Sequence, residues 1–278
     1  MRIIAIVTCY NPAPELLLKS VASYAPLVEK LLVWRNSVLP EELESELRDR
    51  FKAEFRGDGT NVGISKALNA AWKEAAAEGY DCLLTMDQDS VWHNFDAFLS
   101  HAINHGLSMC FYSPAIVTTG MTYESGSEHC ISPTNSSIIS GSLSPISVLK
   151  IVGGWDEDLK IDAVDDEFCF HAHSLGIKSW ECRAGWLDHR FGDKRPVSFL
   201  WFHFDTFNYP PERLYEIYRN HIIVFRRYKG DDSKVLRYCF IQTWVRRRPL
   251  RIFLGERRKW AKFHAIFRGV KDGFLKKI

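Results

Sequence analysis

Short apolar runs alternate with segments of helical spacing along the first third of the chain. The apolar runs have the continuity of strands that are covered on both faces of a sheet. The predicted strands are 2–10, 29–37 and 82–86, and the predicted helices are 14–24, 41–54 and 66–78. Ser65 is the predicted N-cap of the third helix, and Gly79 is its predicted stop. This alternation predicts an α/β fold with a doubly wound, mostly parallel sheet.

The second half of the chain is less regular, but it continues the mixture of strands and helices. Gly176 is the predicted end of a helix that opens with an acidic segment, and a strand follows it. A proline pair opens the last helix of this half. The predicted segments are strands with a short helix in 108–117 and 136–154, a helix at 165–177, a strand at 178–183 and a helix at 210–228.

Polar residues follow the first three predicted strands. Thr8 and Asn36 lie at the ends of the first two strands, and Asp87 and Asp89 lie at the end of the third. In doubly wound sheets, ligands bind beyond the carboxyl ends of the strands. We therefore expect these four residues to mark the ligand-binding edge of the sheet.

The stretch DCLLTMDQDSVW ends an apolar run on two carboxylates that one residue separates. Alternate side chains of an extended backbone share a face, so Asp87 and Asp89 are predicted to point the same way. Such a pair suits a hard divalent cation, Mg²⁺ or Mn²⁺, that bridges a diphosphate leaving group. A polar turn, or a phosphoryl-transfer nucleophile with its acid, also fits the triplet taken alone.

Seven acidic residues crowd the segment 153–176. Asp165 and Asp166 stand at the start of its predicted helix, where the helix dipole favours anions. Capping explains one such carboxylate but not the whole group. His189 follows another apolar segment, and an isolated histidine is more often structural than a ligand.

Charge is unevenly distributed along the chain. The 53 residues from Arg226 onward hold 17 Lys and Arg against 4 Asp and Glu, a net charge of +13, and the first 225 residues carry −11. Such a basic segment indicates an anionic partner. The seven cysteines are scattered without a C-x-x-C pair, which indicates reduced thiols in a cytosolic protein. No apolar run reaches the ~18 residues of a membrane-spanning helix.

Taken together and in order, these motifs resemble the inverting glycosyltransferases of family 2, and within them the rhamnosyltransferase-like branch. The resemblance is collinear over residues 3–228 and implies a GT-A fold with transfer from a nucleotide sugar, commonly dTDP-L-rhamnose in this branch. The motifs that carry it are VTCYNP (7–12), NVGISKALNAA (61–71), LLTMDQDS (83–90), SGSL (140–143), GGWDEDLKIDAVDDEFC (153–169), DHRFG (188–192) and YEIYRNHI (215–222).

The resemblance implies a role for each matching residue. Asp165 is the implied general base, and the indole of Trp155 is the implied stacking surface for a sugar. The implied metal ligands are Asp87, Asp89 and His189. The expected donor-binding residues, with Asn36 added from its place at a strand end, are Thr8, Asn36, Asn61, Gly63, Asn69, Asp87 and Asp89. The expected acceptor-binding residues are Gly154, Trp155 and Asp166.

One position departs from the family. Arg35 stands in VWRNS where the family usually has an acidic residue that contacts the nucleotide. The base contact and the identity of the nucleotide are therefore open.

The basic C-terminal segment predicts a second functional region. We expect a glycosyltransferase domain at 1–228 and a basic amphipathic region at 229–278. Its interleaved cationic and apolar residues suit interfacial helices on anionic lipid. The resemblance implies a glycan acceptor, often linked to a polyprenyl diphosphate at the inner face of the cytoplasmic membrane, and so a peripheral cytoplasmic enzyme of surface-polysaccharide synthesis. A basic face packed on the acidic body is the alternative, and no nucleic-acid partner is expected.

Two other functions compete with this hypothesis. LLTMDQDSV also fits a HAD-type phosphohydrolase, with Asp87 as nucleophile and Asp89 as acid. That family usually places the motif on its first strand, whereas here two strand–helix units come before it. A noncatalytic membrane-associated scaffold is the other alternative, and the retention of both aspartates with Asp165 and His189 argues against it.

Overall fold

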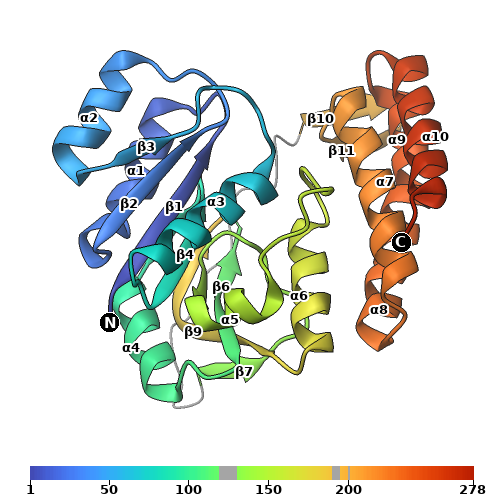
Figure 1. The fold of residues 1–278 in the computed structure, drawn as a ribbon. Helices are drawn as coiled ribbons and strands as arrows, with labels where there is room; N and C mark the ends of the chain where they lie inside the picture. Colours follow the sequence, from blue (N-terminus) through green and yellow to red (C-terminus); the bar gives the residue numbers. More distant parts are fainter. Residues whose placement is uncertain (119–129, 190–194, 200) are drawn as a thin grey trace. The chain divides into compact units, whose positions relative to one another are not determined.

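The computed structural model describes residues 1–118, 130–189, 195–199 and 201–278 (Figure 1). The chain divides into two compact units, which we describe separately. The first comprises residues 1–160 and 164–190, and the second comprises residues 161–163 and 191–278.

The first unit is built on a mixed sheet in which the strands run in the order β3-β2-β1-β4-β8-β6-β9-β5, with β7 paired to β9. The strands are β1 Ile3–Cys9, β2 Lys30–Arg35, β3 Glu54–Arg56, β4 Cys82–Asp87, β5 Val91–His93, β6 Cys110–Val117, β7 Ile131–Pro133, β8 Ser142–Pro145 and β9 Lys178–Asp188. Strands β3, β2, β1 and β4 are parallel, as the sequence predicted. Strand β8 then pairs antiparallel with both β4 and β6.

Helices cover the sheet of the first unit. They are α1 Pro14–Ala22, α2 Glu41–Phe51, α3 Ile64–Ala77, α4 Phe95–His105, α5 Ile146–Val152 and α6 Val164–Ser174, with a short 3₁₀ turn at Ala25–Leu27. Alternate residues of β1, among them Ala5 and Val7, share one buried cluster with Leu17 of α1, Leu43 of α2 and Phe98 of α4. Helix α3 packs against β1 and β4 and also contacts α5.

Helix α3 begins two residues earlier than predicted. Gly63 is its N-cap, and Ser65 lies inside the helix and donates its hydroxyl to the carbonyl oxygen of Leu159 at 2.5 Å, so the predicted Ser65 cap is wrong. Gly63 has a φ of +87°, and a Cβ there would lie 2.9 Å from the carbonyl oxygen of Lys160. Glycine is therefore required where the loop before α3 meets the 160 segment.

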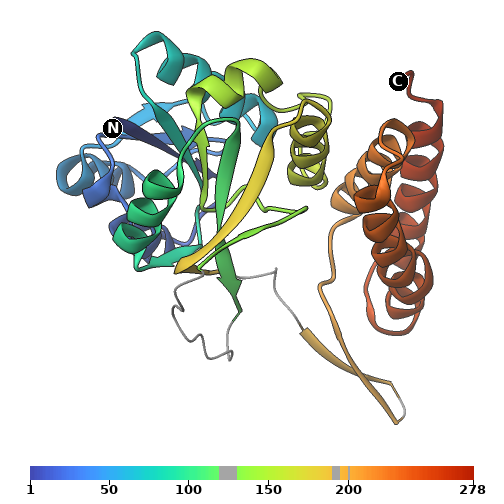
Figure 2. The same cartoon turned by 90° about the horizontal axis from the view of Figure 1, so that it is seen from below.

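The second unit is a hairpin with a helical bundle (Figure 2). Its elements are β10 Arg195–Phe199, β11 Phe202–Thr206, α7 Pro211–Arg227, α8 Asp231–Phe240, a π-helical turn at Ile241–Arg247, α9 Arg248–Gly255 and α10 Lys259–Leu275. Helices α7 and α10 pack closely through Gly269 and Gly273. A Cβ at Gly269 would lie 2.5 Å from the carbonyl oxygen of Tyr215, so small residues let the two backbones approach.

A buried ionic group stabilises this second unit. The carboxylate of Glu256 is 0% exposed and pairs with Arg248 at 3.0 Å and with Lys262 at 2.6 Å. The hydroxyl of Thr206 also donates to this carboxylate. Two cations and a hydrogen bond thus offset the cost of removing the carboxylate from water.

The compact units do not divide where the basic segment begins. Helix α7, which the sequence analysis placed with the first domain, belongs to the second unit. The proposed functional division at residue 228 remains a prediction about roles. Among the described residues, we find no helix with the length and apolar character needed to cross a membrane.

Candidate active site

The carboxyl ends of β1, β2 and β4 bring several predicted site residues together. Thr8 is paired in register with Asp87 on one side and with Trp34 on the other. Asn36 follows β2 directly, and its backbone N–H donates to the carbonyl oxygen of Cys9 at 2.8 Å. The sheet therefore gathers Thr8, Asn36 and Asp87 at its carboxyl edge, where the strand pattern predicted a ligand site.

The D-x-D triplet straddles the end of a strand. Strand β4 ends at Asp87, and Gln88 and Asp89 form a turn, so the predicted extended backbone through Asp89 is wrong. The side-chain oxygen of Gln88 accepts from the N–H of Tyr10 at 2.7 Å, and its amide nitrogen donates to the Tyr10 carbonyl at 3.2 Å. Gln88 thus ties the loop after β1 to the turn after β4.

His189 lies beside this turn. Its backbone N–H donates to the carbonyl oxygen of Val117 at 3.1 Å. Its Nδ1 lies 2.8 Å from the hydroxyl of Ser90 and 3.9 Å from Oδ2 of Asp87. Burial lowers the pKa of His189, and the negative charges of Asp89, Asp165 and Asp188 oppose that shift. The imidazole therefore lies close to Asp87 and within electrostatic reach of Asp89 and Asp165.

The predicted metal ligands are gathered but do not form a ready-made metal site. No group of three or more His, Cys, Asp or Glu side chains in the described part of the chain is arranged to hold a metal ion. The Nδ1 atom of His189 interacts with Ser90, and Asp87 and Asp89 sit on either side of the strand end. The donor set has the carboxylate and imidazole chemistry that Mn²⁺ accepts, but its geometry is not that of a closed coordination sphere.

Asp165 and Asp166 open helix α6 as a coupled pair. The backbone N–H of Asp166 donates to Oδ1 of Asp165 at 3.1 Å. Loss of water around Asp166, and then the charge of Asp165, raises the pKa of Asp166. Asp165 also acts electrostatically on His189, and it lines a small cavity with Trp155 and Phe168. Asp165 is thus the member of the pair that lines the cavity and acts on His189.

Asn69 organises the loop that precedes α6. Its side-chain nitrogen donates to the carbonyl oxygen of Trp155 at 2.8 Å, and its side-chain oxygen accepts from the Trp155 N–H at 2.9 Å. The same oxygen accepts from Nε1 of Trp72 at 3.1 Å. A Cβ at Gly154 would lie 2.2 Å from that oxygen, so the loop closes on Asn69 only with glycine there.

The indole of Trp155 is not an open platform. It is 5% exposed and stacks on Phe168 with ring centroids 4.9 Å apart. Its Nε1 is buried, and no described residue forms a hydrogen bond with it. The expected sugar-stacking surface is therefore not presented in this structure, because the ring packs into the core beneath the loop.

Asn36 and Asn61 shape the loop that leads into α3. The amide nitrogen of Asn36 donates to the carbonyl oxygen of Gly63 at 3.3 Å, and its oxygen accepts from the N–H of Val62 at 3.2 Å. The oxygen of Asn61 accepts from the N–H of Gly63 at 3.0 Å. Asn36 is buried, whereas Asn61 is exposed at the rim.

Arg35 is engaged within the protein. Its Nε donates to the carbonyl oxygen of Gly57 at 3.0 Å, and its Nη1 pairs with Glu44 at 3.2 Å. Arg35, which stands where the family usually has an acidic residue, therefore links the turn at Gly57 to helix α2.

The structure adds residues that the sequence analysis did not single out. Ser90 contacts His189, Gln88 joins two loops, and Ser140 accepts the backbone N–H of Asp87 at 3.2 Å. The sequence offered one clue to each serine. Ser90 directly follows the D-x-D triplet, and Ser140 is the first residue of the SGSL motif. Part of the DHRFG motif, residues 190–192, lies outside the described residues.

Neither a protein-family model nor a curated protein sequence matches this chain. Solved structures do match its fold. TarS 1–349 of S. aureus has a TM-score of 0.56 at 16% identity, with 97% of this chain and 81% of TarS 1–349 covered. TarS 1–349 in complex with UDP-GlcNAc gives 0.59 at 15% identity, with 99% and 81% covered. GalNAc-T7 with UDP, GalNAc and Mn²⁺ gives 0.61 at 10% identity, with 99% of this chain but 56% of GalNAc-T7 covered.

The fold is GT-A. The likeness extends over nearly the whole chain, and the mixed, mostly parallel sheet with its flanking helices and C-terminal helical extension is the architecture that the sequence predicted. At these identities the likeness establishes the fold and leaves the chemistry to the residues at the strand ends.

Proposed function

We propose that this protein is an inverting glycosyltransferase that moves a sugar from a nucleotide diphosphate sugar to a hydroxyl of a glycan acceptor. The observation that carries the proposal is the position of His189 at the carboxyl edge of a GT-A sheet, with its Nδ1 3.9 Å from Asp87. Burial lowers the pKa of His189, and the charges of Asp89 and Asp165 raise it against that effect. The structural likeness to TarS in complex with UDP-GlcNAc and to GalNAc-T7 with UDP supports the same class of donor.

The reaction is a single in-line displacement at the anomeric carbon. Asp165 accepts the proton of the acceptor hydroxyl as that oxygen forms its bond to the anomeric carbon. The bond between this carbon and the diphosphate oxygen breaks, and the nucleoside diphosphate leaves. No covalent enzyme intermediate forms, so the anomeric configuration inverts. Asp165 is the proposed base because it lines the cavity beside Trp155 and acts electrostatically on His189.

We propose that Asp87, Asp89 and His189 hold Mg²⁺ or Mn²⁺ when a diphosphate donor is bound. The cation would neutralise the charge that grows on the leaving diphosphate. The presence of Mn²⁺ in the GalNAc-T7 structure supports this part of the proposal. Oxygens of the donor would supply the ligands that the protein side chains alone do not.

The donor is the narrower question. The resemblance to the rhamnosyltransferase-like branch favours dTDP-L-rhamnose, and UDP sugars are the alternative. On the protein side, Thr8 and the loop of Asn61 and Gly63 are the proposed nucleotide contacts, because Thr8 is paired with Asp87 and the loop is bonded to Asn36 at the end of β2. Asn36 and Asn69 act through the loops that they hold, since their amide groups are bonded to backbone.

We propose that the acceptor is a glycan, carried by a polyprenyl diphosphate, and that the second unit meets the anionic membrane surface. The unit exposes aromatic and aliphatic side chains among its cations, and Trp260 is 87% exposed. Co-sedimentation with phosphatidylglycerol vesicles tests this role. Trp260→Ser should lower the bound fraction, and equal binding of the two proteins would count against a membrane-facing α10.

A donor panel tests the proposed reaction class. The purified chain is titrated calorimetrically, with Mn²⁺ present, against dTDP-rhamnose, UDP-GlcNAc, UDP-GalNAc and GDP-mannose. We expect one donor to bind with a Kd in the ~1 μM to 1 mM range usual for enzyme substrates, and Asp87→Ala to weaken it. Preference for a UDP sugar would keep the class and replace rhamnose. Failure of every nucleotide sugar to bind would contradict the proposal.

A further inference from the structure

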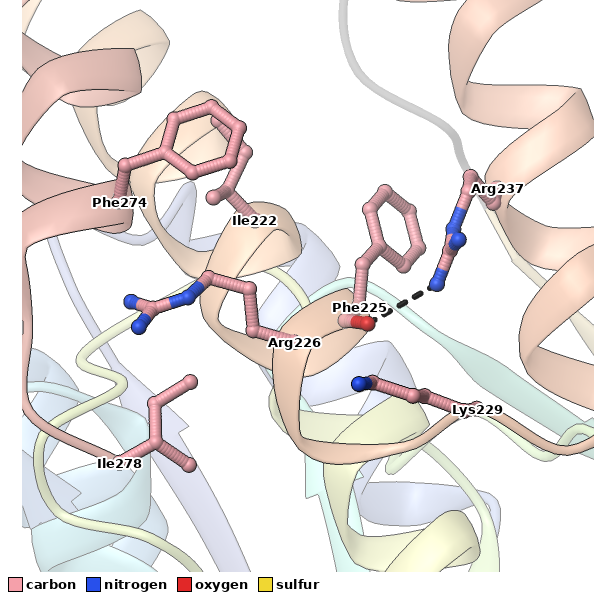
Figure 3. A pocket seen from close by; sticks show the side chains of 7 residues that line it. All are labelled: Ile222, Phe225, Arg226, Lys229, Arg237, Phe274 and Ile278. Carbon is pink, nitrogen blue, oxygen red and sulfur yellow. Dashed lines mark hydrogen bonds between the residues drawn. The ribbon is translucent and has the colours of Figure 1, made fainter.

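The second unit contains a groove that the proposed catalysis does not use. It has a volume of about 540 Å³ and lies between α7, α8 and the end of α10. This volume is within the ~300–1,000 Å³ that small-molecule sites usually have. Three cations and four apolar side chains line it (Figure 3), and they are Ile222, Phe225, Arg226, Lys229, Arg237, Phe274 and Ile278.

Two of the cations are held in place by backbone carbonyls. Arg226 donates from Nη1 to the carbonyl oxygens of Gly273 at 2.9 Å and Lys276 at 2.8 Å. Arg237 donates from Nη2 to the carbonyl oxygen of Phe225 at 2.9 Å, which Figure 3 shows as a dashed line. Neither guanidinium is paired with a carboxylate among the described side chains. Their positions are thus fixed at the groove by backbone carbonyls rather than by any carboxylate that the structure describes.

Donor capacity remains for a ligand. The Nε of Arg237 is buried and has no hydrogen-bond partner among the described residues. An unsatisfied buried donor costs stability, and an anion that accepted from it would remove that cost. Lys229 is exposed at the end of α7, and its ammonium makes no ion pair with any side chain that the structure describes. Figure 3 shows the Arg226 side chain extending toward Phe274 and Ile278, away from Lys229 and Arg237, so an anion beside Phe225 would meet the charges of Lys229 and Arg237.

The rest of the lining is apolar. Phe274 and Ile278 are 61% and 58% exposed, and Ile222 and Phe225 line the same groove from α7. A free inorganic anion would leave these side chains in contact with water. A ligand with an anionic head and a hydrocarbon portion would satisfy the cations and cover the apolar side chains at once.

We propose that this groove binds one anionic lipid, with its phosphate head at Lys229 and Arg237 and its first chain carbons against Ile222, Phe274 and Ile278. The groove would give the second unit a defined phospholipid site in addition to a general attraction to a charged surface. The inference rests on the proposed membrane-facing role of this unit, and it does not depend on the proposed glycosyl transfer.

The test uses a soluble short-chain lipid, so that binding to the groove is measured in the absence of a membrane surface. The full chain is titrated calorimetrically with dihexanoyl phosphatidic acid below its micelle concentration, with dihexanoyl phosphatidylcholine and with inorganic phosphate. We expect phosphatidic acid to bind at least about tenfold more tightly than either of the others, because only it offers both an unscreened phosphate and chain carbons.

Variants decide where the lipid binds. Lys229→Gln should weaken phosphatidic acid binding about tenfold, and Arg237→Gln should do so at least as strongly. Lys271→Gln, which removes an exposed lysine of α10 outside the groove, should leave binding unchanged. Phe274→Ser should weaken phosphatidic acid without changing phosphate binding.

Three results would overturn the proposal. The first is equal binding of inorganic phosphate and phosphatidic acid, which would make the groove a simple anion site. The second is that Lys229→Gln binds phosphatidic acid as tightly as the wild type does. This result can be obtained even if Arg237→Gln does not fold. The third is no binding of phosphatidic acid at all. If the protein binds soluble phosphatidic acid but does not bind vesicles, only the membrane-facing role of the second unit is contradicted.

Discussion

The side chain of Asn69 makes two hydrogen bonds with the backbone of Trp155, donating to its carbonyl at 2.8 Å and accepting from its N–H at 2.9 Å. The amide of Asn69 thus bonds both backbone groups of Trp155, as a neighbouring strand would, and joins the loop before α6 to α3. Asp165 follows that loop, so the position of the proposed base depends on Asn69 indirectly. The predictions below begin from this contact.

Asn69→Leu should destabilise the protein by about 2–4 kcal/mol, because two buried backbone groups of Trp155 lose their partners. Urea unfolding measures this loss. Asn61→Ala, which removes an exposed side-chain bond to Gly63, is the control and should cost about 1 kcal/mol or less. Equal losses in the two variants would mean that the Asn69 bonds do not hold the loop.

Gly154→Ala should be far more costly than Gly153→Ala. Both residues have positive φ, at +88° and +84°, so both alanines carry the ~1–2 kcal/mol cost of left-handed backbone. Only the Cβ at Gly154 meets neighbours, 2.2 Å from Asn69 and 2.4 Å from Trp72, whereas nothing lies within 4 Å of a Cβ at Gly153. Thermal unfolding of the two variants compares them, and matching midpoints would contradict the tight closure.

Asp166→Asn should stabilise the protein at high pH. The raised pKa means that Asp166 holds its proton more tightly in the folded than in the unfolded state. Stability therefore falls as the pH rises from the ordinary aspartate pKa to the raised one. The advantage of Asp166→Asn should grow through that interval by up to ~1.4 kcal/mol per pH unit. Unfolding of both proteins at pH 5 and pH 8 measures it.

The control for this pH series is Asp49→Asn, which removes an exposed carboxylate near the end of α2. Its stability relative to the wild type should change little between the two pH values. An Asp166→Asn advantage that is the same at pH 5 and pH 8 would show that Asp166 is not held protonated by its surroundings.

Removal of divalent cations should stop transfer. Exhaustive EDTA treatment should lower turnover of the preferred donor by about 100-fold or more, since metal stabilisation of a leaving diphosphate amounts to several kcal/mol. Added Mn²⁺ should restore turnover in the wild type but not in Asp89→Asn. Full activity after EDTA, measured as nucleotide release, would remove the metal from the mechanism.

Sequence patterns predicted the parallel half of the sheet well, because buried strands and their helices have local signatures. They also placed Thr8 beside Asp87, since both follow from strand ends that share an edge. The predicted backbone at Asp89 failed because the strand's end depends on where β8 and the 140 segment pair, which is long-range information. The ends of the strands could be predicted from the sequence, whereas the turn that follows β4 could not.

The remaining differences have the same origin. Trp155 was expected as a sugar platform, but its ring is covered by Phe168, a partner thirteen residues away on a helix whose docking the sequence does not encode locally. Arg35 stood out as a departure from the family, and its partner Glu44 lies across a loop on α2. The hydrogen bond of Ser90 to His189 joins residues that only the folded sheet brings together.

The central claim is that Asp165 is the general base of an inverting transfer, and one pair of measurements tests it directly. Donor binding and turnover are measured for the wild type and Asp165→Asn with the preferred nucleotide sugar and its acceptor. We predict unchanged donor Kd and a turnover lower by ~10²–10⁴-fold, the usual contribution of a positioned base. Near-normal turnover of Asp165→Asn would contradict the account.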